Sequence, residues 1–200
     1  MHCVEPGAAA IDRALAPVLD LASRMHVRLI VVLRPAKLMI AEHLRPVADR
    51  VDLVFTYQAD RHGLETAGAL AAAAPLCTSR VLLVLPDQFY RRPGRGNPLA
   101  TAVDRLAHHR WAVVAARLTD PAALRAEGAL RLDDDARVTD AAEKPADPAP
   151  FNAAWVSLAC RRDALDEMPK VFDRAAASPL TGAPAVLVDG YRNLTVPGAA

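Results

Sequence analysis

Short runs of aliphatic residues alternate along this chain with longer segments in which apolar residues recur at helical spacing. The runs fall at residues 28–33, 52–56, 81–85 and 112–116, and the helical segments at 8–25, 36–44, 62–74 and 99–108. Continuous runs rich in Val and Leu are typical of strands that are buried on both faces. Their alternation with helices predicts a three-layer α/β fold, with a mainly parallel sheet between helices and right-handed crossovers.

The second half of the chain breaks this alternation. Residues 130–132 and 138–139 flank an acidic turn and predict a β-hairpin. Further strands are expected at 154–160 and 185–188. The sheet is therefore expected to be mixed, within a single domain that spans residues 1–200.

Composition argues against several classes of function. The chain has 24 Lys and Arg against 23 Asp and Glu, so its net charge of +1 provides no general field to attract nucleic acid. No apolar run approaches the roughly 20 residues that cross a membrane, and no leader is recognisable. The three cysteines, Cys3, Cys77 and Cys160, are too far apart to suggest a zinc site. We expect a cytoplasmic protein that binds neither nucleic acid nor a membrane.

Asp87 is the first candidate for a functional residue, because it follows the apolar run at 81–85 almost directly. Ligands of open α/β sheets bind beyond the carboxyl ends of the strands, which is where this carboxylate is expected to lie. Mg²⁺ prefers oxygen ligands and often bridges them to a substrate phosphate. Taken alone, a carboxylate after a strand favours the plainer interpretation, in which Asp87 caps the next turn or helix.

Three other patterns occur in order, and each also has a plain structural alternative. Gln58 and the segment 63–68, which contains Gly, Thr and Ala, lie where a strand gives way to a helix. Such a helix start exposes backbone N–H groups to a ligand but also suits close packing. Lys144, within Glu143-Lys144-Pro145, supplies a point charge for a phosphate or is a solvated surface lysine. Asn193 follows the last strand as a second contact to a metal or phosphate, or lies in a plain turn.

In this order the four patterns resemble those of the nucleotidyltransferase superfamily, which makes nucleoside-diphosphate sugars and related activated metabolites. The resemblance covers nearly the whole chain and implies a Rossmann-like fold. It implies that Asp87 and Asn193 bind Mg²⁺ and that Asp87 and Lys144 are catalytic. It further implies that four residues hold the nucleobase, namely Gln58, Gly63, Thr66 and Ala67.

The same resemblance implies where a phosphorylated acceptor binds. The Glu143-Lys144 pair would contact its phosphate, and Asn152 and Trp155 lie where family members contact the sugar or other acceptor. Core packing is the alternative for Trp155. Arg91 and Arg92, in a loop rich in Pro, Gly and Arg, either help to bind the anionic acceptor or form a solvated surface.

One part of the family pattern is missing from this sequence. Family members open with a strand and a Gly-rich loop, roughly Gly-x-Gly-Thr-Arg, whose backbone N–H groups hold the triphosphate. Residues 1–7 resemble the stretch just after that loop, so we expect the chain to be truncated at its N-terminus relative to the family. Loss of a central strand also predicts an exposed apolar sheet edge and a homo-oligomer formed through it.

The resemblance thus implies a Mg²⁺-dependent transfer of a nucleoside monophosphate from a nucleoside triphosphate to a phosphorylated small molecule such as a sugar 1-phosphate, with release of pyrophosphate. The missing loop keeps a second interpretation open, a catalytically inactive relative that binds a nucleotide or a partner subunit. A dinucleotide-binding domain is disfavoured, since no strand is followed by G-x-G-x-x-G.

Overall fold

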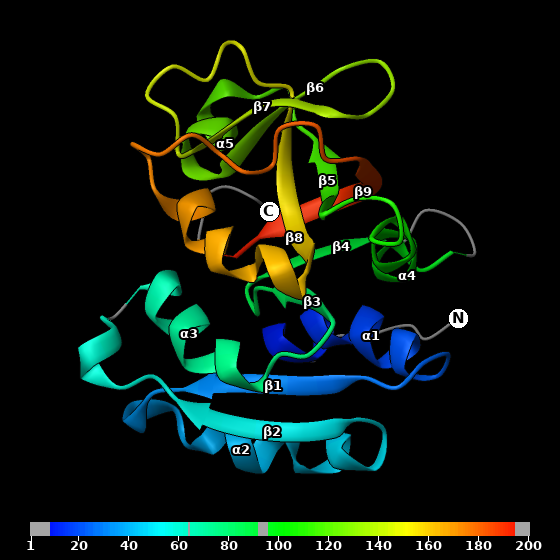
Figure 1. Cartoon of the computed structure of the whole chain (residues 1–200), viewed down its shortest axis with the longest axis vertical. Helices are drawn as coiled ribbons and strands as arrows, with labels where there is room; N and C mark the ends of the chain where they lie inside the picture. The colour runs from blue at the N-terminus through cyan, green and yellow to red at the C-terminus, as the bar shows by residue number, and fades with distance from the viewer. Residues whose placement is uncertain (1–8, 64, 92–95, 195–200) are drawn as a thin grey trace.

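The computed structural model describes residues 9–63, 65–91 and 96–194, which form the strands and helices drawn in Figure 1. The strands are β1 (Arg28–Leu33), β2 (Asp52–Tyr57), β3 (Arg80–Val84), β4 (Gln88–Arg91), β5 (Trp111–Arg117), β6 (Gly128–Leu132), β7 (Val138–Glu143), β8 (Ala153–Arg161) and β9 (Ala185–Asn193). The α-helices are α1 (Ala10–Ala22), α2 (Met39–Leu44), α3 (Thr66–Ala73), α4 (Pro98–Arg105) and α5 (Pro121–Ala126). The 3₁₀ helices are η1 (Pro35–Lys37), η2 (Arg45–Asp49), η3 (Asp60–His62), η4 (Ala74–Leu76) and η5 (Arg162–Phe172).

Seven strands form one mixed sheet, in the order β4-β9-β5-β8-β6-β7 with β3 also beside β8. On one side β8 pairs with β5, and on the other it pairs with β6 near its start and with β3 at its end. β8 is antiparallel to β3 and β5, whereas β5 and β9 are parallel, so β3, β5 and β9 point the same way. Their carboxyl ends therefore meet at one edge of the sheet.

β1 and β2 form a second, two-stranded parallel sheet. It starts with Arg28 opposite Asp52, and Nε of the arginine lies 2.6 Å from Oδ2 of the aspartate. Within the described part of the chain β1 pairs only with β2, and β3 only with β8. The apolar side chains of β1 and β3 are mostly half-buried, whereas Val113 and Val114 in the middle of β5 are fully buried. β1 and β3 are thus strands with one unpaired side.

Helices cover both faces of the sheets and create two apolar clusters. One cluster brings α3 and η5 against the face that carries Val113. The other brings α1 and α4 against the face that carries Val114, and it includes Leu29 of β1 together with Leu82 of β3. Because the two sheets contribute to one cluster under the same helices, they share a layer. The predicted three-layer α/β fold with a mixed sheet is confirmed.

The structure also differs from the predictions in detail. All eight strands expected from the sequence are present, but β7 and β9 run several residues further. β4 and α5 were not expected, and the 3₁₀ helix η5 contains Pro169. None of the helices in the described residues is long and apolar enough to cross a membrane.

Candidate active site

Asp87 lies just beyond the carboxyl end of β3 and directly before β4, where its side chain is half-buried. Its carbonyl oxygen accepts a hydrogen bond of 3.0 Å from the backbone N–H of Leu194, which follows β9. Asp87, which is predicted to bind metal beyond the end of β3, is therefore hydrogen-bonded to the residue that follows β9. This contact brings Asp87 close to Asn193, the last residue of β9.

Glu127, directly before β6, is the centre of this region and is only 4% exposed. Its Oε2 accepts a hydrogen bond of 2.8 Å from the hydroxyl of Tyr191. The side-chain amide of Asn193 donates to both carboxylate oxygens, with Nδ2 3.0 Å from Oε1 and 3.1 Å from Oε2. Burial raises the pKa of Glu127 above its usual range, the charge of Asp87 raises it further, and both hydrogen bonds and Lys144 oppose the shift.

Lys144 joins the same group from the end of the β6–β7 hairpin. Its backbone N–H donates to the carbonyl oxygen of Glu127 at 2.9 Å, and its φ of 47° is unusual for a residue with a side chain. The ammonium nitrogen of Lys144 lies 3.7 Å from Oε1 of Glu143. Burial raises the pKa of Glu143, and the charges of Lys144 and Arg174 partly offset this. The Glu-Lys pair therefore adjoins Glu127 at the edge that carries Asp87.

Gln58 follows β2 and lies in the layer of the two-stranded sheet. Its Nε2 donates to the carbonyl oxygens of Gly63 at 2.6 Å and Glu65 at 3.0 Å, while its Oε1 accepts from Nε of Arg34 at 3.2 Å. Gly63 has a φ of 76°, which favours glycine. The amide of Gln58 thus holds the loop that leads into α3.

Thr66 and Ala67, the other residues predicted to hold a nucleobase, open α3 directly after that loop. Ala67 is exposed and Thr66 is half-buried. Both are accessible positions on the first turn of a helix, and Gln58 fixes the loop from which they start.

Asn152 and Trp155, which were predicted to contact the acceptor, both make contacts within the protein that stabilise the fold. The side-chain amide of Asn152 forms hydrogen bonds with both backbone groups of Leu132. Its Oδ1 accepts from the N–H of Leu132 and its Nδ2 donates to the carbonyl oxygen, each at 2.9 Å. Trp155 is 3% exposed and packs edge to face on Phe172, with ring centroids 5.6 Å apart. These contacts favour the core interpretation of Trp155 and give Asn152 the same kind of role.

Arg91 ends β4, is exposed, and packs its side chain against Gly190 of β9. It therefore belongs to the strand pair that also carries Asn193. Arg92, predicted with it as a contact to the acceptor, lies outside the described residues.

The structure therefore brings the predicted residues, apart from Arg91, Arg92, Asn152 and Trp155, into two groups. One group, around Glu127, gathers Asp87, Lys144 and Asn193 with Glu143. The other consists of Gln58 and the start of α3. Sequence reasoning missed Glu127 and Tyr191, for which the only available signal was an acidic residue placed directly before an apolar strand.

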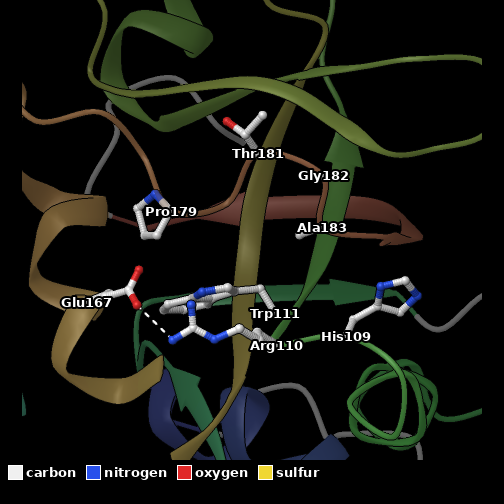
Figure 2. A pocket seen from close by; sticks show the side chains of 8 residues that line it. All are labelled: His109, Arg110, Trp111, Glu167, Pro179, Thr181, Gly182 and Ala183. Atoms are coloured by element: carbon white, nitrogen blue, oxygen red, sulfur yellow. Dashed lines mark hydrogen bonds and ion pairs between the residues drawn. The ribbon is translucent and has the colours of Figure 1, made fainter. Parts of the chain in front are cut away.

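A separate cavity of about 250 Å³ lies at the opposite end of the sheet (Figure 2). Its lining includes Arg110, Trp111 and Glu167, and an ion pair of 2.8 Å joins Nη2 of Arg110 to Oε1 of Glu167. Arg110 and Trp111 stand at the amino end of β5, whereas Asn193 stands at the carboxyl end of the parallel strand β9. A nine-residue strand spans roughly 25–30 Å, so this cavity is remote from the group around Glu127.

Solved structures of low sequence identity share this fold. UDP-glucose pyrophosphorylase from Acinetobacter baumannii matches with a TM-score of 0.69 at 12% identity, over 95% of this chain and 79% of that one. HddC from Yersinia pseudotuberculosis matches with a TM-score of 0.59 at 16% identity, over 91% of this chain and 79% of that one. A search of curated proteins gave no significant match.

A family model described as "Nucleotidyl transferase" matches residues 14–159. The matched segment includes Asp87, Glu127 and Lys144, and it extends over well more than half of the sequence. On this match, and in agreement with the shared fold, the chain belongs to the nucleotidyl transferase family.

Proposed function

We propose that this protein transfers a nucleoside monophosphate from a nucleoside triphosphate to a phosphorylated small molecule, such as a sugar 1-phosphate, and releases pyrophosphate. The observation that carries the proposal is the grouping of Asp87, Lys144 and Asn193 around the buried Glu127. Family membership supports the reaction class. Structural neighbours support the choice of substrates, since one is a UDP-glucose pyrophosphorylase and another is such an enzyme with UTP bound.

In the proposed reaction a phosphate oxygen of the acceptor attacks the α-phosphorus of the triphosphate. The bond from that phosphorus to the oxygen of the β-phosphate breaks, and pyrophosphate leaves. The protein contributes position and charge rather than a covalent intermediate. Lys144 would hold the acceptor phosphate, with Glu143 and Arg91 beside it, and Gln58 with Gly63, Thr66 and Ala67 would shape the nucleobase site.

Mg²⁺ fits the residues at the carboxyl edge of the sheet. Asp87 and the amide oxygen of Asn193 are hard oxygen donors that could hold it. Two buried acceptors of the same region, Oε1 of Gln88 and Oε2 of Glu143, have no hydrogen-bond partner in the described structure. A region rich in acceptors and poor in donors is suited to a cation. When bound, Mg²⁺ would neutralise charge on the reacting phosphates.

The metal site would be completed by the substrates. Within residues 9–63, 65–91 and 96–194 no three His, Cys, Asp or Glu side chains form a group that could hold a metal. Mg²⁺ commonly takes only one or two protein carboxylates and fills its remaining positions with phosphate oxygens and water. We therefore expect Mg²⁺ binding to depend on a bound nucleotide.

Charge balance favours a second candidate function, nucleotide or partner binding without catalysis. Around Glu127 the structure gathers the carboxyl groups of Asp87, Glu127 and Glu143, against the cations Lys144 and Arg174. A triphosphate carries several negative charges and needs cationic or N–H partners, so this surplus of carboxyl groups weakens the binding of a triphosphate in the reactive position.

One experiment separates these functions. The purified chain is unfolded thermally with each common nucleoside triphosphate, with and without Mg²⁺, and pyrophosphate release is then assayed with a panel of sugar 1-phosphates. A triphosphate at about 100 times its dissociation constant should stabilise the fold by about 2.7 kcal/mol, which corresponds to a rise of roughly 5–10 °C in Tm. We expect a base-selective, Mg²⁺-dependent rise together with pyrophosphate release.

Asp87→Ala should abolish the Mg²⁺-dependent rise and lower the rate by about 100-fold or more. The matched control is Asp134→Ala, at an exposed position in the β6–β7 turn, which should keep both. Stabilisation without pyrophosphate release would establish the binding function instead. No stabilisation by any triphosphate would contradict both the transfer reaction and nucleotide binding, and would leave partner binding as the candidate function.

Two further parts of the proposal concern the whole chain. We propose that the 200 residues form one domain, because strands β3, β5, β8 and β9 contribute to both apolar clusters. A cytoplasmic location accords with the free thiols of Cys77 and Cys160. The unpaired side of β1 supports self-association with a second copy through a sheet edge.

A further inference from the structure

Glu127 has no role in the reaction as proposed, although it is the most highly connected side chain of the site. Its carboxylate is almost completely buried and receives three hydrogen-bond contacts from two side chains of β9, Tyr191 and Asn193. Burial of a carboxylate is costly unless its hydrogen bonds are made. Such an arrangement at the carboxyl edge of the sheet calls for an explanation beyond packing.

The contacts of Glu127 join three segments that are distant in the sequence. Its carbonyl oxygen accepts from the backbone N–H of Lys144, and its side chain holds Asn193. The residue that follows that strand, Leu194, donates to the carbonyl oxygen of Asp87. The phosphate-binding lysine and the two proposed metal ligands are therefore linked through one buried carboxylate.

The hydrogen bonds also determine which end of the Asn193 amide faces the carboxylate. Both oxygens of Glu127 accept from Nδ2, so the amide nitrogen faces Glu127 and the amide oxygen is directed elsewhere. A flipped amide would set Oδ1 against a carboxylate, with no donor between two acceptors. Only the oxygen of an asparagine side chain serves as a ligand for a hard cation.

We propose that Glu127 is a positioning residue, which turns the carbonyl oxygen of Asn193 toward the cation site that this residue forms with Asp87. The inference rests on the proposed function, because it concerns the metal site of that reaction. Glu127 acts through the amide of Asn193 and touches neither metal nor substrate. Outer-sphere partners of this kind typically change metal affinity by about 10- to 100-fold when they are replaced.

The test measures Mn²⁺ binding to the full chain by electron paramagnetic resonance, with Mn²⁺ as a probe for Mg²⁺, and so does not depend on catalysis. Glu127→Gln keeps the size of the side chain but allows the Asn193 amide to take either orientation. We expect it to weaken Mn²⁺ binding about 10-fold. Glu127→Asp keeps the charge and shortens the reach, and we expect a loss of similar size because position rather than charge is altered.

A double-mutant cycle shows whether the effect passes through Asn193. In an Asn193→Ala background, Glu127→Gln should change Mn²⁺ affinity less than twofold. A purely electrostatic effect of Glu127 would persist in that background. The matched control is Glu167→Gln, which makes the same change in a hydrogen-bonded carboxylate at the remote cavity of Figure 2 and should leave Mn²⁺ affinity unchanged.

The outcomes distinguish the inference from the proposed function. If the wild-type chain binds Mn²⁺ and Glu127→Gln and Glu127→Asp bind it equally well, the inference is wrong and the proposed metal site stands. If the effect of Glu127→Gln is the same with and without Asn193, Glu127 does not act by orienting the amide. If the wild-type chain binds no Mn²⁺, with or without a triphosphate, the proposed metal site itself is wrong. Thermal unfolding of each variant without metal verifies folding, and Glu127→Asp is decisive should Glu127→Gln not fold.

Discussion

Gly128 leaves no space for a side chain, because the indole ring of Trp155 lies against its backbone. A Cβ added at Gly128 would overlap that ring, and Trp155 is itself held by Phe172 in the core. We expect Gly128→Ala to lower the free energy of unfolding by about 1–3 kcal/mol, the usual cost of overpacking. Urea denaturation measures this.

The control for Gly128→Ala is Gly96→Ala, where an added Cβ meets no atom of the described residues within 4 Å. It should change stability by less than about 1 kcal/mol, in the stabilising direction through the unfolded state. Equal urea midpoints for the two variants would show that the ring of Trp155 moves aside freely. A role for that ring in ligand binding would then have to be considered again.

Residues whose roles depend on local position could be predicted from the sequence. Asp87 was predicted to lie after a strand, and the structure places it there, whereas Asn193 was predicted to follow the last strand and is instead the last residue of β9. Glu127 could not be predicted as a central residue, since an acidic residue before a strand is usually solvated and its burial depends on β9, more than 55 residues away. Hydrogen bonds within the loop determine the orientation of the Gln58 amide, and they too are invisible in the sequence.

Among the elements, β9 contains the pair Asp189-Gly190, although Asp-Gly is commonly a turn signal. The sequence predicts a last strand at 185–188, which ends just before this pair. In the structure β9 continues to Asn193, and Gly190 has a φ of 60° where its pairing with β4 shifts register. Glycine at positive φ also marks a β-bulge, and only the presence of β4 distinguishes the two.

Asn97 joins two helices and caps one of them. Its Oδ1 accepts from the N–H of Leu99 at 2.9 Å at the start of α4, while its Nδ2 donates to the carbonyl oxygen of Pro17 at 2.8 Å and to Oδ2 of Asp20 at 2.9 Å, both in α1. We expect Asn97→Ala to cost about 2–3 kcal/mol, because it removes a cap and leaves buried groups unpaired. Thermal or urea unfolding gives the value.

Two further variants show how much of this loss comes from the cap of α4 and how much from the hydrogen bonds that link Asn97 to α1. Asn97→Asp keeps the cap but sets a carboxylate against Asp20, so a loss above about 1 kcal/mol assigns stability to the link with α1. Asp120→Ala removes an exposed cap from α5 and should cost only about 0.5–1 kcal/mol. If Asn97→Asp is as stable as the wild type, apolar packing alone holds α1 to α4.

For the molecule as a whole, the layers of the fold could be predicted from the sequence, whereas the order of the strands in the sheet could not. Continuous apolar runs between helical segments dictate a covered sheet whatever the order of its strands. The position of β8 between β3 and β5, antiparallel to both, depends on pairings across about 40 to 80 residues that leave no local pattern. The separation of β1 and β2 from the larger sheet depends on the same non-local pairing.

That separation leads to a prediction about assembly. The carbonyl oxygens of Val27 and Leu33 accept from the N–H groups of Asp52 and Gln58 on the side of β2. Because backbone groups alternate along a strand, the N–H of Ile30 faces the unpaired side of β1. Two copies joined there about a two-fold axis would each complete the other's edge. We expect the mass in sedimentation equilibrium to rise from 21.4 kDa toward twice that value with concentration.

Ile30→Pro removes only an edge donor, so it should abolish this association and leave the chain folded. Val31→Pro removes an N–H on the side of β2 and should destabilise the two-stranded sheet instead, which makes it the matched control. A single species of 21.4 kDa at every concentration would exclude the edge as a contact between copies. Association that survives Ile30→Pro with the fold intact would assign the contact to another surface, since β1 offers no second strand edge in the described structure.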